Sequence, residues 1–203
     1  KDMYQFRCVD DDYSSAGSDH QKCALFLCET VIRSDMDSTD SQKKIITFGK
    51  NNNYKDSEIR KWLRGRCTGE AGLQMGAGAL MPVNVGVRTA FLGQTSPGTE
   101  GEAAETELVK YTLLPQMMSD RMFLLSVEEA LEYREELWDT VSEESSYSRG
   151  YWLRTPVYQE GENGGFTYGT EAYAVDLRDG TIGPAEVSDG SFGLRPAYCL
   201  PQS

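Results

Sequence analysis

Two short apolar segments, each with one arginine close to a proline, constrain the fold of this chain more than any other feature. They are Tyr151–Pro156 (YWLRTP) and Gly193–Tyr198 (GLRPAY). An unpaired guanidinium is costly to bury, so Arg154 and Arg195 should each meet a carboxylate or several carbonyl groups. The two segments predict a rigid β frame with Trp152 in its core. An arginine that recognises an acidic ligand would instead need an exposed side chain.

The interval between these segments is rich in Tyr, Ser, Gly, Thr and Asp. Binding loops favour such residues because Tyr offers a large contact area with few rotatable bonds, whereas Ser and Gly adapt. Plain surface loops are the alternative, because turn geometry also enriches Gly, Ser and Asn. Aromatic rings beside carboxylates and amides suit a carbohydrate, and a protein ligand would use the same rings. The residues that we expect to bind a ligand are Tyr158, Asn163, Phe166, Tyr168, Tyr173 and Asp189.

Length and charge narrow the possible classes of protein. The 203 residues favour a single domain over 1–203, which we expect to be part of a larger or processed protein. A formal net charge of −12 repels phosphate backbones, so nucleic acid is not an expected partner. No run approaches the roughly 18 apolar residues that span a bilayer, so we expect no membrane insertion. The oligomeric state stays open.

Patterns for catalysis and metal binding are sparse. His20 is the only histidine, which argues against a zinc site or a Ser-His-Asp triad. The five cysteines form no CxxC pair and are interpreted mainly as buried apolar residues, with one disulfide near the start as the alternative. Asp10–Asp12 and Asp35, Asp37 and Asp40 can supply calcium ligands, but the EF-hand order is missing and solvated loops are favoured. We expect no catalytic residue and no cofactor, with calcium as the alternative.

Local patterns in the first two thirds predict strands, two helices and one long loop. A helix capped by Asp56 or Ser57 should bury Ile59, Trp62 and Leu63, which have i, i+3, i+4 spacing. Aromatic and β-branched residues predict short strands at Tyr4–Val9, Cys23–Cys28 and Lys44–Phe48.

The second helix should follow a buried strand at Met122–Leu125. Ser126 and Glu129 have the spacing of a capping box, and the helix that they open should run through Trp138. Gly65–Gly101 has many Gly and Ala residues with few periodic apolar ones, and we expect a long irregular loop there.

The remainder of the chain reads as antiparallel β-structure. Asp179-Gly180 is typical of a hairpin turn between alternating strands. The expected strands are Tyr151–Arg154, Gly165–Tyr168, Glu171–Leu177, Thr181–Val187 and Phe192–Leu200.

The W-L-R-T-P segment, the Asp179-Gly180 hairpin and the closing G-L-R-P-A-Y segment resemble an uncharacterised domain family. That family occurs in surface and secreted proteins of gut-dwelling Gram-positive bacteria. The resemblance extends upstream in the same order, through Asn53-Tyr54, Ser57–Arg60, Trp62-Leu63 and Phe123–Ala130. It therefore covers nearly the whole chain.

The family is similar in turn to the C-type-lectin-like fold, in the version shared with formylglycine-generating enzymes and the variable proteins of diversity-generating retroelements. This resemblance implies an α+β fold, with two main helices on a twisted antiparallel sheet and long irregular loops. It implies that Gly193–Arg195 is a core strand and that the residues between Pro156 and Ser191 display the ligand surface. The chain departs from the enzymes, which use two close cysteines near the C-terminus, because it has only Cys199 there.

Together these features predict a non-catalytic ligand-recognition module, secreted or at the cell surface, that binds a glycan or a protein through its C-terminal loops. An enzyme of formylglycine-generating descent, using Cys199 with Cys67, is one alternative. A structural module of a surface protein is the other, and it would have no patch of exposed aromatic residues.

Overall fold

The computed structural model describes residues 4–14, 23–35, 45–68, 80–96, 105–139 and 147–201. Strands make up 47% of the structure and helices 16%, so the protein is mostly β, with curled sheets and a half-barrel. The expected α+β, C-type-lectin-like fold with two main helices is therefore wrong. The sheets account for most of the difference, because they extend into segments that were expected to be loops.

The first sheet has four antiparallel strands in the order β1-β2-β12-β5. Strand β2 matches the expected Cys23–Cys28 strand, whereas β1 begins and ends later than expected. No strand forms in the described part of the expected Lys44–Phe48 strand, where the Ile46 amide instead donates to the Ser34 carbonyl at 2.8 Å. The bounds are β1 Phe6–Tyr13, β2 Cys23–Cys28, β5 Met122–Phe123 and β12 Ala197–Pro201.

The second sheet has the order β10-β9-β6-β11, with β11 parallel to β6 and the other pairs antiparallel. The expected hairpin at Asp179-Gly180 is confirmed: it joins β9 to β10, and Gly180 has a φ of 71° that glycine adopts without strain. The bounds are β6 Gly150–Pro156, β9 Glu171–Asp176, β10 Ile182–Glu186 and β11 Phe192–Gly193.

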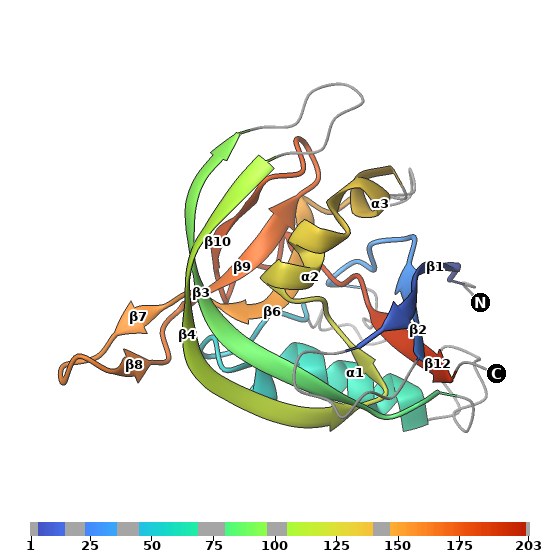
Figure 1. Cartoon of the computed structure of the whole chain (residues 1–203), viewed down its shortest axis with the longest axis horizontal. Coiled ribbons are helices and arrows are strands. Elements are labelled where there is room, and N and C mark those ends of the chain that lie inside the picture. Colours follow the sequence, from blue (N-terminus) through green and yellow to red (C-terminus); the bar gives the residue numbers. More distant parts are fainter. Residues whose placement is uncertain are drawn as a thin grey trace.

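A long two-stranded ribbon, β3 (Val83–Ser96) with β4 (Glu105–Asp120), curves around the body of the molecule (Figure 1). The expected irregular loop at Gly65–Gly101 is therefore wrong over β3. Val83, Val85 and Val87 alternate as a half-buried strand requires, but the Gly and Ala residues of the longer window obscure this period. Shifts in the register of the ribbon interrupt the pattern further.

One regular helix and two short ones complete the fold. Helix α1 (Glu58–Thr68) follows the 3-10 turn η1 (Tyr54–Asp56), and the Ser57 hydroxyl accepts from the Arg60 amide at 3.0 Å as an N-cap does. The Ser126–Glu129 capping box is confirmed. The helix that it opens breaks at Tyr133, which separates α2 (Val127–Glu132) from α3 (Arg134–Asp139).

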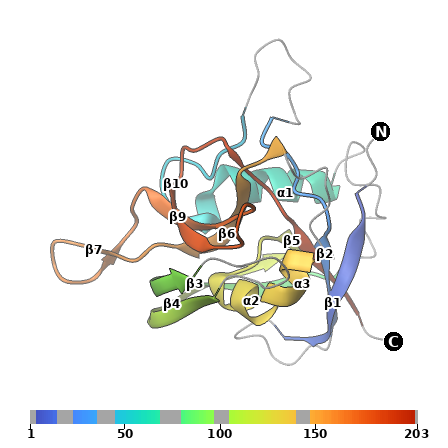
Figure 2. The same ribbon diagram turned by 90° about the horizontal axis from the view of Figure 1, so that it is seen from above.

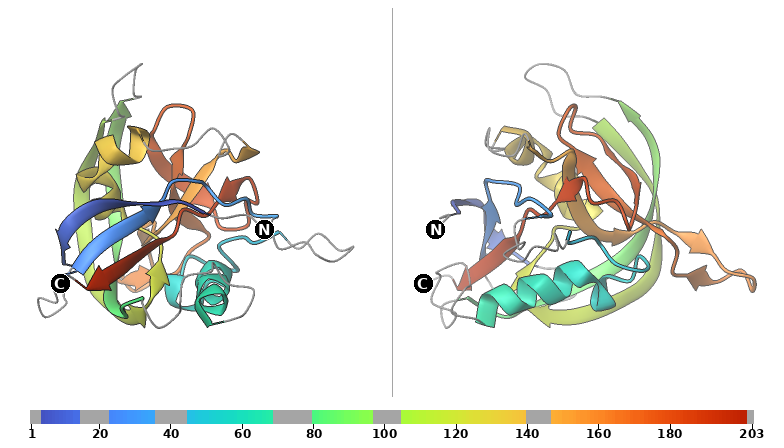
Figure 3. Two further views of the ribbon diagram at one scale, coloured as in Figure 1. Left: turned by 90° about the vertical axis from the view of Figure 1, so that its right-hand side faces the viewer. Right: turned by 180° about the vertical axis from the view of Figure 1, so that it is seen from behind.

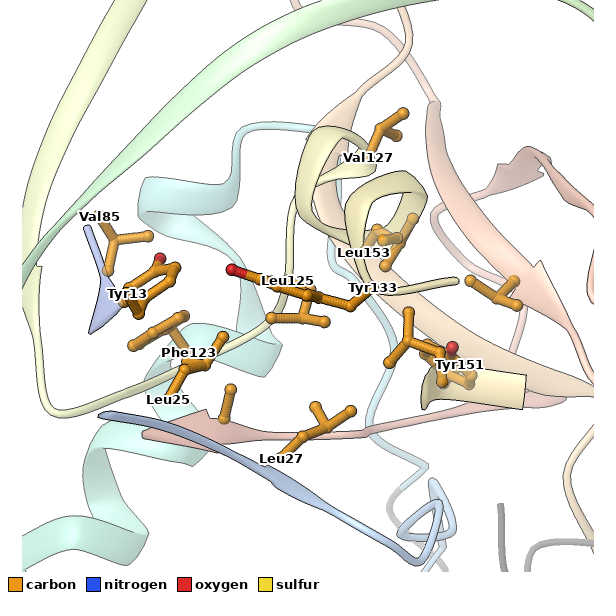
Figure 4. Packing of buried hydrophobic residues seen from close by; sticks show 14 of the residues in the cluster. Tyr13, Leu25, Leu27, Val85, Phe123, Leu125, Val127, Tyr133, Tyr151 and Leu153 are labelled. Atoms are coloured by element: carbon orange, nitrogen blue, oxygen red, sulfur yellow. The ribbon is translucent and has the colours of Figure 1, made fainter. Parts of the chain in front are cut away.

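Strand β6 is buried on both faces and separates two hydrophobic clusters. Tyr151 and Leu153 face the cluster formed with the first sheet and α2, which Figure 4 shows. Trp152 faces the other, where its ring lies 5.5 Å from Phe48 and 5.1 Å from Phe192. The single strand therefore supplies large side chains to both halves of the interior.

The other expected core residues occupy different depths. Ile59 and Leu63 of α1 are buried, whereas Trp62 is only partly buried at the edge of the second cluster. Cys23, Cys28 and Cys199 are buried free thiols, and Cys8 is free and exposed, so no disulfide joins these four. The interpretation as buried apolar residues is confirmed for three of them.

Replacing Gly150 by Ala should destabilise the fold severely. A Cβ atom there would lie 1.9 Å from the Val175 carbonyl oxygen, and backbone cannot move aside as a flexible side chain can. We expect Gly150→Ala to lower the free energy of unfolding by about 3 kcal/mol in urea titrations. Gly183→Ala on β10 is the matched control, because its Cβ would meet nothing within 4 Å. Equal stability of the two variants would contradict this packing.

Candidate functional site

A small hairpin, β7 (Gln159–Glu160) with β8 (Phe166–Thr167), projects from the body beyond the curved ribbon (Figures 1 and 2). We call residues 158–168 the arm. Figure 3 shows the arm and the first sheet at opposite ends of the molecule. The arm leaves the body after β6 and returns to it before β9, so both of its ends begin from a buried sheet.

Asn52 fixes the base of the arm. Its side-chain amide donates to the carbonyls of Val157, at 3.2 Å, and Glu171, at 2.8 Å. Its side-chain oxygen accepts from the Gly169 amide at 2.9 Å, and its own backbone amide donates to the Gly169 carbonyl at 2.9 Å. Asn52 is almost fully buried, so these bonds are shielded from water. One side chain therefore holds both ends of the arm.

The tip of the arm is a glycine-rich turn. The Gly161 amide donates to the Gly165 carbonyl at 2.6 Å, and the Gly164 amide donates to the Gly161 carbonyl at 3.0 Å. Gly164 has a φ of 73°, a backbone conformation that is unfavourable for residues other than glycine. Asn163 lies in this turn with its side chain exposed.

Three aromatic rings form a row along the arm. The Phe166 ring centroid lies 6.1 Å from that of Tyr158 and 5.0 Å from that of Tyr168, with an edge-on approach in the second pair. Tyr158 and Phe166 are half-buried, and Tyr168 is 37% exposed. The Tyr168 hydroxyl accepts from the side-chain amide of Gln116 on β4, and burial together with the charge of Asp56 raises the pKa of Tyr168. The row is partly supported by the body and partly open to solvent.

The structure brings together four of the six residues that the sequence suggested for ligand binding. Tyr173 is apart from them and only 3% exposed, because it lies on the buried strand β9. Its hydroxyl donates to the Ala90 carbonyl at 3.1 Å and accepts from the Leu92 amide at 3.2 Å, which fastens β3 to the sheet. Asp189 lies beside β11, where it accepts from the Ser191 amide at 2.8 Å. The four grouped residues are Tyr158, Asn163, Phe166 and Tyr168.

Two residues of the arm region were missed by the sequence reasoning. Asn52 lies in an Asn-rich stretch that resembles an ordinary turn, and Gln116 follows Pro115, a residue that argues against a strand, although both lie within β4. Neither has a local signal, because their partners are more than fifty residues away in the chain.

Arg154 of the first apolar segment is 1% exposed and pairs with Glu129, its Nη2 lying 2.7 Å from Oε1. It also donates to the carbonyls of Gly86, at 2.9 Å, and Leu124, at 2.7 Å. The Tyr13 hydroxyl donates to the same Glu129 carboxylate at 2.8 Å. The Arg154 guanidinium is therefore hydrogen-bonded to groups inside the protein and does not face a ligand.

Arg195 of the second segment is equally buried and meets carbonyl groups. It donates to the Cys28 and Leu137 carbonyls, each at 2.8 Å, and its guanidinium lies over the Tyr151 ring at 5.4 Å. These contacts join β2, α3 and β6 around one side chain.

Opposing effects act on the ionisation of Glu129. Burial raises its pKa, but the charge and hydrogen bonds of Arg154, with those of Ser126 and Tyr13, outweigh burial and hold the pKa below its ordinary value. The pair therefore stays ionised inside the protein at neutral pH.

The cysteine chemistry of the enzyme alternative rests on Cys199 and Cys67. Burial raises the pKa of the Cys199 thiol, and the neighbouring Cys23 raises it further, so Cys199 stays protonated and a poor nucleophile. The side chain of Cys67 lies outside the described residues.

Within the described ranges, no group of three or more His, Cys, Asp or Glu side chains is placed to hold a metal ion. Asp37 and Asp40, two of the possible calcium ligands, lie outside those ranges. None of the described helices is long and apolar enough to cross a membrane.

The chain belongs to the family described as "Domain of unknown function (DUF6273)", whose model matches residues 25–202. This match confirms the resemblance to an uncharacterised domain family. No curated protein and no solved structure matches the chain.

Arg154→Met should lower the free energy of unfolding by about 3–5 kcal/mol, because it leaves Glu129 buried without its counter-charge. Urea titrations followed by tryptophan fluorescence measure this loss. Arg178→Met is the matched control, since the Arg178 side chain is 74% exposed and its pair with Asp176 should contribute less than about 1 kcal/mol. A similar loss in both variants would argue against the central role of the buried pair.

Protonation of Glu129 at acidic pH should lower the free energy of unfolding. Its pKa is lower in the folded than in the unfolded protein, so its contribution is present above the unfolded pKa and is lost as pH falls through the folded value. Unfolding free energies between pH 7 and pH 3 should therefore fall more steeply in the natural protein than in Glu129→Gln. Parallel curves would show that Glu129 is not the titrating group.

Proposed function

We propose that this domain is a non-catalytic extracellular recognition module, secreted or at the cell surface, that binds a glycan or a protein through the arm. The observation that carries the proposal is the row of three rings on a projecting hairpin with a fixed base. A loop on a rigid frame can present such rings without rearrangement of the body. The extracellular location rests on the resemblance to surface and secreted proteins.

A glycan is the ligand that this surface suits best. Aromatic rings offer a flat apolar face to one side of a sugar, and tyrosine adds a polar group at the rim. Glu160 and Gln116 lie next to the rings, Asn163 is exposed in the turn at the tip, and the three provide acceptors and donors for sugar hydroxyls. A protein ligand would use the rings as anchors and is the second candidate.

The composition of the arm favours binding over chemistry. Residues 158–168 include no His, Cys, Ser or Lys, and their two carboxylates, Glu160 and Glu162, are exposed to solvent, whereas carboxylates tuned for catalysis lie in clefts. The ring of Tyr168 contacts Phe166 and its hydroxyl accepts from Gln116, yet Tyr168 remains 37% exposed, and exposed aromatic surface of this kind favours an interaction site over a purely structural module.

Removing a ring from the arm should weaken ligand binding. The test is a glycan array and a panel of extracellular proteins, probed with the natural protein, followed by titration calorimetry on any ligand found. Phe166→Ala and Tyr168→Ala should each reduce affinity about tenfold or more, as loss of an anchoring ring does. Tyr168→Phe keeps the ring and should retain most of the affinity.

Tyr147→Ala is the matched control, because Tyr147 is a tyrosine that is 74% exposed and lies before β6, outside the arm. It should leave binding unchanged. Binding that Phe166→Ala and Tyr168→Ala do not alter would exclude the arm as the site, and an absence of any ligand in both panels would count against a recognition module.

A further inference from the structure

A cleft lies away from the arm, where β1, β3 and α2 meet beside the buried Arg154 of β6. The cleft has a volume of about 330 Å³, which lies in the range of small-ligand sites. Its walls include Asp10 and Asp12 of β1, Gly86 and Arg88 of β3, and Glu128 and Glu132 of α2.

Two separate hydrogen-bonded sets form the floor of the cleft: one is buried around Glu129, and the other joins Tyr133 to the half-buried Asp10 at the foot of a wall. Glu129 accepts from Arg154 and from the Tyr13 hydroxyl, and the Tyr133 hydroxyl donates to Asp10 at 2.5 Å. Tyr13 and Tyr133 belong to the same hydrophobic cluster, which Figure 4 shows. Because these groups satisfy one another, the floor is fixed in shape and leaves recognition to the walls.

Three charged side chains of the walls, of both signs, have no partner among the residues that the structure describes. Arg88, Glu128 and Glu132 make no ion pair or side-chain hydrogen bond with the part of the protein that the structure describes. Glu128 and Glu132 are one helical turn apart, so they share a face of α2 and repel each other when nothing positive lies between them. Arg88 belongs to β3, a different wall.

The overall charge of the cleft is negative. Its lining includes five carboxylates and two guanidiniums, and the pair formed by Glu129 and Arg154 cancels at the floor. The electric field of the remaining carboxylates attracts a cation, whereas the guanidinium of Arg88 can form a bidentate pair with a carboxylate. A ligand that satisfies both walls has to be zwitterionic and carry an excess of positive charge.

We infer that this cleft binds a small basic amino acid of the lysine class. An ammonium group of the ligand lies between Glu128 and Glu132, and its carboxylate pairs with Arg88. The inference rests on the cavity, its fixed floor and the opposed unpaired charges together, and it does not depend on whether the arm binds a glycan.

Titration calorimetry with L-lysine tests the inference, with cadaverine, which lacks the carboxylate, as the comparison probe. The natural protein should bind L-lysine at least about tenfold more tightly than cadaverine, because only lysine engages Arg88. Arg88→Gln should weaken lysine binding about tenfold but should not weaken cadaverine binding, because cadaverine has no carboxylate and the loss of a positive charge favours a dication. The double variant Glu128→Gln, Glu132→Gln should lose both ligands.

Glu135→Gln is the matched control: it removes an exposed carboxylate from α3, outside the cleft, and should bind lysine as the natural protein does. Circular dichroism confirms that each variant is folded before titration. Three results would overturn the inference: no heat of binding with about 10 mM lysine, equal affinity for lysine and cadaverine, or full binding by the double glutamate variant.

Discussion

The buried pair of Arg154 and Glu129 organises the rest of this structure. A guanidinium without water must find its acceptors inside the protein, and Arg154 finds them on three elements: α2, the curved strand β3 and the segment before α2. Tyr13 connects β1 to the same contact, because its hydroxyl donates to the Glu129 carboxylate. The first sheet, the ribbon and the second sheet therefore meet at one charged contact, and their relative positions depend on its geometry.

Strand β6, which carries Arg154, links the charged pair to both hydrophobic clusters. Its alternating side chains enter both hydrophobic clusters, so a shift of the strand would disturb packing on each side. The arm continues directly from its end, and the buried amide of Asn52 holds the point of departure. The position of the aromatic row is thus set by the same strand that carries Arg154, although the arm itself is far from the charged pair.

Local signals in the sequence identified what is local in the structure. The capping box of Ser126 and Glu129, the Asp179-Gly180 turn and strand β2 depend on neighbouring residues and were predicted correctly. The pairing of Glu129 with Arg154 was not predicted, because the capping box already explains a glutamate at this position. Ribbon β3–β4 was missed for a related reason, since its glycines and irregular register hide the alternation that defines a strand. The arm's composition suggested a surface, but only the fold separates Tyr173 from its neighbours in sequence.

The attachment of the arm has a consequence for how this domain can diversify. The hydrogen bonds of Asn52 at the two points where the arm leaves and rejoins the body go to backbone atoms. Backbone contacts are indifferent to side-chain identity, so the residues between those points can change in kind and number while the junction stays the same. The domain is therefore suited to exchange its projecting segment as a cassette, and a segment transplanted from a relative would begin and end on an anchor that is already in place.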